Sequence, residues 1–309
     1  MENLIYHYTS MNAFMHLVDS IKKSSNNESF IFQASDVFYM NDPQEFIYGQ
    51  RVLFDTIKKT EENRRIPVKE RLSEDLKKLQ QKHNGNSFKY ISSIIHDNYN
   101  TPFVISLSQN KDSLPMWLNY GANGNGVCLG FQKSKIKEQK ESPGSKTFTF
   151  QSTMDWKSVR YHNSDVKDNT ESNEIIYKMI DNYYDQLYAS KIQGSRNLDN
   201  LKVNAIFDLL VEVCPYIKRN DYEYEQEVRI VRKSRVVGED YLRKLQFRIN
   251  GKGNVIPYIN VEIPKEYLKL VKIGPLANYE LTSSALKMIK EKYDLDYDLC
   301  QSCVKYRNY

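Results

Sequence analysis

Cysteine is scarce in this sequence, which narrows the kinds of fold and site to consider. The 309 residues contain only Cys128, Cys214, Cys300 and Cys303, too few for a disulfide framework in a chain of this length. Cys300 and Cys303 have the spacing of a zinc or redox pair, but no second cysteine pair or histidine pair completes a zinc set. We therefore expect a reduced protein with no bound metal.

Long apolar runs are also missing. No stretch approaches the roughly 20 apolar residues that cross a bilayer. The segment Met1–His7 lacks the basic and apolar regions of a secretory signal. These absences favour a cytoplasmic protein that does not contact a membrane. The net charge of +5 permits a polyanionic partner but does not require one.

Several motifs that define enzyme classes do not occur. There is no Gly-rich phosphate loop with Lys and Ser or Thr, no GxGxxG after a strand, no HExxH and no GxSxG. The sequence therefore carries no signal for a P-loop nucleotidase, a Rossmann domain, a zinc protease or an α/β-hydrolase.

Short apolar strands and longer helical patterns are interspersed along the chain, without internal repeats. Helices are predicted over residues 174–191, 198–218 and 281–293, among others, and strands over 4–8, 30–33, 103–108, 127–131, 159–161, 225–232, 255–263 and 271–273. This order predicts an α+β fold. We expect a single domain over residues 1–309, with small mixed or antiparallel sheets, inserted helices and polar surface insertions at about 61–89 and 133–147.

The run Asp221–Val231, DYEYEQEVRIV, is the most informative stretch. Residues two apart in a strand share a face, so an extended run would align Glu223, Glu225 and Glu227 with Arg229. Aligned carboxylates repel each other unless a cation, a metal or a ligand offsets them. The run is thus a candidate site, and the alternative is a solvated strand entry, since charge runs are usually exposed.

Three further groups of polar and aromatic side chains are candidates for ligand contacts. His7 lies in the first strand and is suited to hold a ribose hydroxyl or to act as an acid or base. Ser106 and Ser108 place two hydroxyls on one face at the end of an apolar strand. Trp117 and Tyr120, three apart on a helix, form either an aromatic wall for a ring or part of the core.

Several short motifs, taken in their order along the chain, resemble a bacterial family, the domain of unknown function 2971. They are Tyr6-His7-Tyr8-Thr9, Asn41-Asp42-Pro43-x-Glu45, Ser106-x-Ser108 with Met116-Trp117-x-x-Tyr120, Gly126-Val127-Cys128-Leu129-Gly130-Phe131, Glu225-x-Glu227-x-Arg229, Ile273-Gly274-Pro275 and Ser302-x-x-x-Tyr306-Arg307. The resemblance runs from about residue 4 to 307. It implies one domain and, from the settings in which such proteins occur, a role in phage defence.

A more distant resemblance is to the ADP-ribosyltransferase superfamily, which has a His in the first strand, hydroxyls in a middle strand and a Glu in a late strand. It implies an NAD-using transferase or glycohydrolase, with Glu227 as catalytic carboxylate and Glu225 positioning the acceptor. The implied cofactor-binding residues are His7, Tyr8, Thr9, Ser106, Ser108, Trp117, Tyr120 and Arg229. The acceptor stays open: protein, nucleic acid, a small molecule or water.

Two other functions remain alternatives. In a metal-dependent nuclease, Asp42, Glu45, Glu225 and Glu227 would hold Mg²⁺, because hard cations prefer carboxylate oxygen. In a binding or regulatory module, the aromatic and acidic residues would form a pocket for a nucleotide, or for a neighbouring defence or immunity protein, without turnover.

Overall fold

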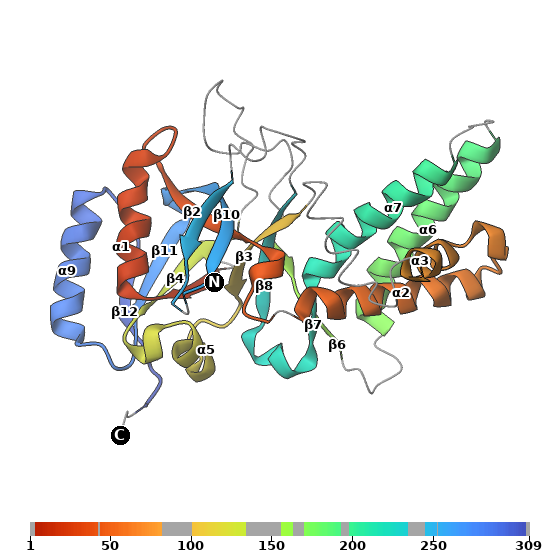
Figure 1. The fold of residues 1–309 in the computed structure, drawn as a ribbon. Helices are drawn as coiled ribbons and strands as arrows, with labels where there is room; N and C mark the ends of the chain where they lie inside the picture. The colour runs from red at the N-terminus through yellow and green to blue at the C-terminus, as the bar shows by residue number, and fades with distance from the viewer. Residues whose placement is uncertain are drawn as a thin grey trace.

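A computed structural model of the chain describes residues 4–42, 44–81, 101–133, 156–162, 170–192, 198–233, 245–251 and 253–306. Within these residues, ten strands form one sheet that joins both ends of the sequence (Figure 1). Its main path is β12 (Asp298–Gln301), β11 (Leu268–Ile273), β4 (Val127–Gln132), β1 (Leu4–Thr9), β3 (Pro102–Ser108), β2 (Ser29–Asp36), β10 (Val255–Pro264) and β9 (Gln246–Ile249). In addition, β8 (Glu227–Lys233) pairs with β3, and β5 (Lys157–Ser158) pairs with β8.

Strand β3 is the branch point of this sheet. On one side it pairs with β8 over its whole length. On the other side it meets β1 at Ser108, opposite Tyr6, and β2 at Phe103 and Val104. Strands β1 and β2 therefore separate along β3 and leave a fork between them. The pairs of the large sheet are antiparallel except β11 with β12. A separate parallel pair consists of β6 (Arg160–His162) and β7 (Ile217–Arg219).

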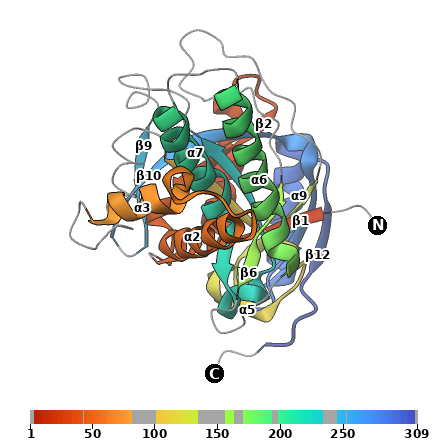
Figure 2. The same ribbon diagram turned by 90° about the vertical axis from the view of Figure 1, so that its right-hand side faces the viewer.

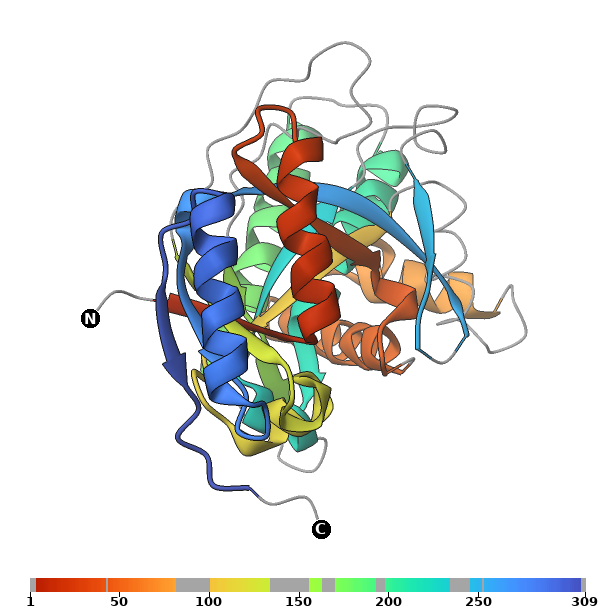
Figure 3. The same ribbon diagram turned by 90° about the vertical axis from the view of Figure 1, so that its left-hand side faces the viewer.

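Helices cover the sheet in two groups. Figure 3 shows α1 (Met11–Ser20) and α9 (Tyr279–Lys292) side by side over one part of the sheet. Figure 2 shows the other group from its outer side. Its members are α2 (Glu45–Asn63), α3 (Leu72–Gln81), α6 (Thr170–Ile192) and α7 (Leu198–Val213). The short α5 (Leu114–Asn119) packs beside β1. The 3-10 helices are η1 (Ile21–Lys23), η2 (Val37–Tyr39), η3 (Val68–Glu70), η4 (Ala122–Gly124), η5 (Cys214–Tyr216), η6 (Asn220–Glu225) and η7 (Lys265–Tyr267).

Alternation along the central strands separates an apolar face from a polar one. In β3, the side chains of Phe103, Ile105 and Leu107 enter the core beneath α1 and α9. Ser106 and Ser108 point to the opposite face, because neighbouring side chains in a strand alternate. Helix α1 begins at its cap Ser10, whose hydroxyl accepts a hydrogen bond from the Ala13 amide at 3.1 Å. On β3, the face of Ser106 and Ser108 is therefore polar beside the fork, whereas Val104 on the same face packs into the apolar core formed with α2, α6 and α7.

The predicted α+β class is confirmed, but most strands belong to one large sheet rather than to small ones. The reason is β3, which pairs with β1, β2 and β8 and so joins two smaller groups of strands. The sequence also gave no expectation of β9. None of the described helices has the length and apolarity needed to cross a bilayer.

The segment 61–81 differs from the expected polar surface insertion. Glu61 is fully buried and accepts hydrogen bonds from the Tyr184 hydroxyl and from the Ser73 amide. Leu72 and Leu76 are also buried, because their four-residue spacing puts them on one face of α3. A few apolar positions in a charged sequence are therefore enough to build a helix–helix interface. Residues 82–89 and 134–147 of the two expected insertions lie outside the described residues.

Two element boundaries differ from the sequence-based prediction, and both shape the site. The helix expected over 198–218 ends at Val213, because Pro215 interrupts helical hydrogen bonding. The chain then forms β7, which carries Lys218. The acidic run is not one extended strand: it is the 3-10 helix η6 through Glu225, and β8 begins at Glu227.

Candidate functional site

A cleft of about 1080 Å³ opens at the fork between β1 and β2. Its walls come from segments far apart in the sequence, including α1, β2, β3, β8, β9 and β10. The predicted site residues that line it are His7, Tyr8, Thr9, Ser106, Tyr120, Glu225 and Glu227, together with Asp42 and Glu45. The fold therefore brings His7 and the two glutamates to one cavity, although more than half of the chain separates them.

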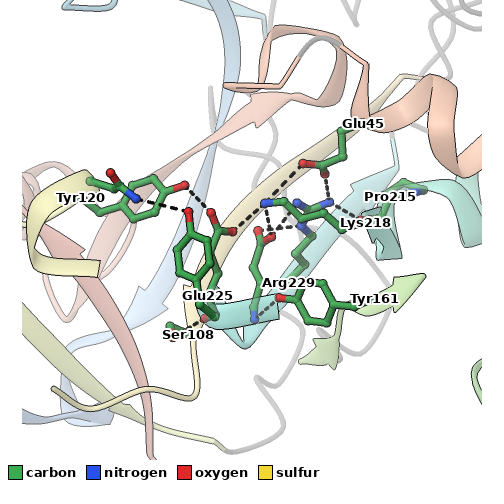
Figure 4. Close-up of polar contacts among 11 residues, drawn as sticks. Glu45, Ser108, Tyr120, Tyr161, Pro215, Lys218, Glu225 and Arg229 are labelled. Carbon is green, nitrogen blue, oxygen red and sulfur yellow. Dashed lines mark hydrogen bonds and ion pairs between the residues drawn. The ribbon is translucent and has the colours of Figure 1, made fainter. Parts of the chain in front are cut away.

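Lys218 is the centre of a buried group of charges on the floor of the cleft (Figure 4). Its ammonium nitrogen lies 2.6 Å from Glu225 Oε2 and 3.1 Å from Glu227 Oε2. Glu45 Oε2 is 3.5 Å away. All four side chains are at most 7% exposed. The alternative of a solvated acidic run is therefore wrong for Glu225 and Glu227, whereas Glu223 is exposed.

Arg229 is the second cation of this charge cluster. Its Nε and one terminal nitrogen each donate to the Glu227 carboxylate at 2.7 Å. The other terminal nitrogen lies 2.5 Å from Glu45 Oε1 and donates to the Pro215 carbonyl. Arg229 is completely buried and is not among the residues that line the cleft. Its geometry holds Glu227 in place and leaves no contact for a cofactor.

The charges of this cluster reinforce one another. Burial alone would raise the pKa of Glu227, but the nearby charges of Arg229 and Lys218 outweigh it and lower the pKa to about 2. Burial would lower the pKa of Lys218, yet the surrounding carboxylates raise it. Three carboxylates against two cations leave a formal charge of −1 at neutral pH. The floor of the cleft is thus suited to a ligand group that carries or develops positive charge.

Gln226 turns both glutamates toward Lys218. Its backbone is left-handed, with φ 41° and ψ 52°. The chain therefore turns between Glu225 and Glu227, which would share one face in a continuous strand. The Glu225 carbonyl accepts a hydrogen bond from the Ser108 hydroxyl at 2.6 Å, and the Glu227 amide donates to Tyr161 Oη at 2.7 Å. Ser108 is fully buried and therefore shapes this turn rather than the cavity surface.

Tyr120 fixes the second glutamate. Its hydroxyl donates to Glu225 Oε1 at 2.8 Å, so both oxygens of Glu225 have donors, one from Tyr120 and one from Lys218. Burial and the adjacent Glu225 charge raise the pKa of Tyr120. The phenol therefore stays protonated and remains a donor at physiological pH.

His7 occupies the fork itself. Its Nδ1 lies 3.3 Å from the Ser106 carbonyl oxygen, which is only an acceptor, so Nδ1 carries the proton. Burial lowers the pKa of His7, although this hydrogen bond opposes the shift. The ring is neutral at pH 7, and Nε2 has no hydrogen-bond partner among the described residues. That nitrogen can accept from a ligand hydroxyl at the wall of the cleft. The buried Ser106 hydroxyl has no hydrogen-bond partner among the described residues, and Ser106 also lines the cleft.

Trp117 and Tyr8 pack against each other and have mainly structural contacts. Trp117 is completely buried, meets the Tyr8 ring edge-on at 4.9 Å and donates to Asp112 Oδ1 at 2.8 Å. The Tyr8 hydroxyl donates to the Asn110 carbonyl and accepts from the Ser113 amide. Trp117 has no open face for a ligand ring, which favours its interpretation as core. Thr9 is buried at the edge of the cleft.

The residues considered for Mg²⁺ are arranged around cations of the protein. Glu45, Glu225 and Glu227 surround Lys218, while Asp42 accepts from the Gln44 amide just before α2. In the described ranges, no group of three or more His, Cys, Asp or Glu has the arrangement of metal ligands. The charges of Glu45, Glu225 and Glu227 are thus offset by Lys218 and Arg229.

Some residues of the site were not expected from the sequence. Lys218 falls in a segment predicted as a helix, and Tyr161, which accepts from the Glu227 amide, belongs to no recognisable motif. Arg248 lies on a strand that no pattern indicated. The sequence signal that was available for Lys218 is Pro215, since a proline three residues earlier argues against a continuous helix.

Comparison with known proteins supports one of the two resemblances. The family described as "Protein of unknown function (DUF2971)" matches residues 116–230, which include part of α5, all of β4 and both site glutamates. The motifs before and after this range are not covered by the match. No curated protein matches the chain. No solved structure matches it either, so the resemblance to the ADP-ribosyltransferase superfamily stays a prediction.

Proposed function

We propose that the protein cleaves NAD in this cleft, as an ADP-ribosyltransferase or an NAD glycohydrolase, on a fold distantly related to that superfamily. The observation that carries the proposal is the pair Glu225 and Glu227, buried at the floor of a polar cleft with His7 on its wall. A carboxylate with a perturbed pKa in a cleft, such as Glu227, is typical of functional sites. The formal charge of −1 on this floor complements the pyridinium of NAD and the cationic sugar that forms as nicotinamide leaves.

The proposed step is a displacement at the ribose carbon bonded to nicotinamide. The carbon–nitrogen bond breaks, and nicotinamide leaves as a neutral molecule with the bonding electron pair. Positive charge then develops on the ribose, where Glu227 stabilises it through space. Glu225 orients the attacking O–H or N–H group of the acceptor, which forms the new bond and releases its proton. His7 Nε2 accepts a hydrogen bond from a ribose hydroxyl.

Nicotinamide release from NAD by the purified protein tests this proposal. Wild type should release nicotinamide, and Glu227→Gln and Glu225→Gln should each reduce the rate at least tenfold. Glu223→Gln is the matched control, because Glu223 lies in the same segment but is exposed. Thermal unfolding of each variant shows whether it folds. Absence of release from wild type, with cell lysate supplied as acceptor, would contradict the proposal.

A specific observation favours a second candidate, binding without turnover. Both oxygens of Glu227 already accept hydrogen bonds from Arg229, and one of them also meets Lys218. A carboxylate that is saturated in this way stabilises charge from a distance but has less freedom to contact a sugar. NAD binding measured by calorimetry, without nicotinamide release under any condition, would support this candidate.

At the level of the cell, we propose a cytoplasmic effector that acts as a toxin in phage defence, since NAD loss stops growth. Its partner would be the acceptor, or an immunity protein that blocks the cleft. Expression of wild type should arrest growth, and expression of Glu227→Gln at equal protein level should not. Equal growth arrest by both proteins would show that any toxicity does not come from NAD cleavage.

A further inference from the structure

Arg248 is a partly buried cation on the wall of the cleft, and it has no acidic partner among the described residues. It lies on β9, and its two terminal nitrogens donate to Gln33 Oε1 at 3.1 Å and to Ser35 Oγ at 2.7 Å. The guanidinium stands over the Tyr258 ring, 5.4 Å from its centroid. All four residues line the cleft. The contacts of this arginine are therefore neutral groups that fix its position without neutralising it.

Three buried cations of the described structure behave differently. Lys218 and Arg229 have glutamates within 3.5 Å, and Lys272 lies 3.1 Å from an Asp112 oxygen. No described carboxylate forms an ion pair with Arg248. Burial accordingly lowers the pKa of Arg248, and only the neighbouring Tyr258 opposes this shift. A partly buried guanidinium without a counter-charge among the described residues is the arrangement expected for an anion site.

The unused donors of Arg248 also point to an anion. A guanidinium carries five N–H donors, and the two hydrogen bonds above use two of them. The three that remain have no partner among the described residues. Such a planar set of donors matches the oxygens of a phosphate better than it matches a single carbonyl. Gln33 and Ser35, by holding two donors, orient the remaining ones.

Arg248 and the acidic floor are far apart across and along the sheet. Ser35, which Arg248 contacts, lies opposite Val104 of β3, and Val104 lies opposite Val231 of β8. Two strand spacings across the sheet, and the four residues from Val231 to Glu227 along it, put Ser35 roughly 16 Å from Glu227. A single phosphate or a single ring is too short to reach both ends. The cleft thus has an anionic floor and a separate cationic wall.

We propose that Arg248 is a phosphate-binding residue of this cleft, and that its ligand is a nucleoside diphosphate or a larger nucleotide that contains one. This inference rests on the proposed function only for the orientation of the ligand, with its phosphates toward Arg248 and its cationic end toward Glu227. Gln33, Ser35 and Tyr258 are positioning residues for the guanidinium.

Binding of ADP, measured by calorimetry, tests the inference independently of turnover, because ADP has no bond to nicotinamide. Wild type should bind ADP, and Arg248→Gln should weaken binding at least tenfold. Arg248→Lys, which keeps the charge but loses the planar donors, should lie between them. The matched control is Arg51→Gln, since Arg51 is exposed on α2 and does not line the cleft. Adenosine and inorganic pyrophosphate separate contributions of the nucleoside and of the phosphates.

Each outcome decides the inference. Support requires a loss of ADP affinity in Arg248→Gln, no change in Arg51→Gln, and no change in adenosine affinity. Equal ADP affinity for wild type and Arg248→Gln, or no ADP binding by wild type, overturns it. If Arg248→Gln does not fold, Arg248→Lys and the salt dependence of wild-type ADP binding provide the test, because salt screens a contact between charges.

The same experiments separate this inference from the proposed function. Arg248-dependent ADP binding without nicotinamide release would support a phosphate site in a protein that does not cleave NAD. Nicotinamide release with the same KM for NAD in wild type and Arg248→Gln would support NAD cleavage and overturn the phosphate site.

Discussion

The Arg229 guanidinium holds the Glu227 carboxylate with two hydrogen bonds of 2.7 Å, from a position two residues later on the same strand. The two side chains share a strand face, so this pairing follows directly from the spacing in the sequence. The carboxylate is oriented by the protein before any ligand enters. Arg229 is therefore a positioning residue, and its removal affects both stability and the charge of the floor.

Arg229→Met should destabilise the fold strongly. The substitution leaves Glu45 and Glu227 buried without their main counter-charge, a loss that typically costs about 3–5 kcal/mol. Urea unfolding followed by circular dichroism measures the change. The control is Arg219→Gln, which removes an exposed pair with Asp221 and should cost less than about 1 kcal/mol. Equal effects of both substitutions would show that the buried cluster contributes nothing special.

Acid should destabilise wild type more steeply than Glu227→Gln. The pKa of Glu227 falls from an ordinary 4.5 to about 2 on folding, so its ionised form stabilises the folded state above pH 4.5. This contribution is lost as the pH falls from about 4.5 toward 2, because the unfolded chain binds the proton first. The slope of unfolding free energy against pH over this window should be smaller in Glu227→Gln. Glu223→Gln should keep the wild-type slope.

Tyr120→Phe should reduce nicotinamide release more than it reduces the stability of the fold. The substitution removes the hydrogen bond to Glu225 Oε1 and should cost only about 0.5–1.5 kcal/mol of stability. Nicotinamide release should fall further than that loss explains, because Glu225 keeps only Lys218 as a donor. Tyr224→Phe is the control, since its exposed hydroxyl accepts a bond of 3.3 Å from Asn119. An unchanged rate of nicotinamide release in Tyr120→Phe would show that the reaction does not need Tyr120 to position Glu225.

Gln226 should tolerate glycine but not valine. At φ 41°, glycine adopts the backbone without strain, whereas a β-branched residue is strained by about 1–2 kcal/mol. Gln226→Gly should therefore keep wild-type stability within about 0.5 kcal/mol, and Gln226→Val should unfold earlier on heating. Gln226 is exposed, so lost packing does not account for such a difference. Similar melting temperatures for the two variants would show that the turn relaxes freely.

Strand periodicity and local spacing carried much of the prediction. The alternation around Ser106 and Ser108 correctly placed both side chains on one face of β3. The two-residue spacing of Glu227 and Arg229 correctly predicted that their side chains share one face of β8. These features depend on neighbours in the sequence, which a pattern records directly.

Features that depend on distant contacts were missed. Lys218 looked like the end of a helix, because nothing nearby shows that three glutamates from two other segments surround it. Glu61 looked like a surface residue, since its buried partner Tyr184 lies on α6. The turn at Gln226 had no glycine or asparagine to signal it. Burial of a charge is decided by tertiary partners, and the local sequence does not contain them.

The cleft is built by strands that are far apart in the order of translation. β1 spans Leu4–Thr9, but β10, which pairs with β2 beside the fork, begins at residue 255. A growing polypeptide already contains His7 and both floor glutamates before the strand that completes this wall exists. Since β9 and Arg248 need β10 as their partner, the cavity can form only after the residues of β10 have been translated. A cell that makes this protein therefore does not meet an assembled cleft before that point of translation.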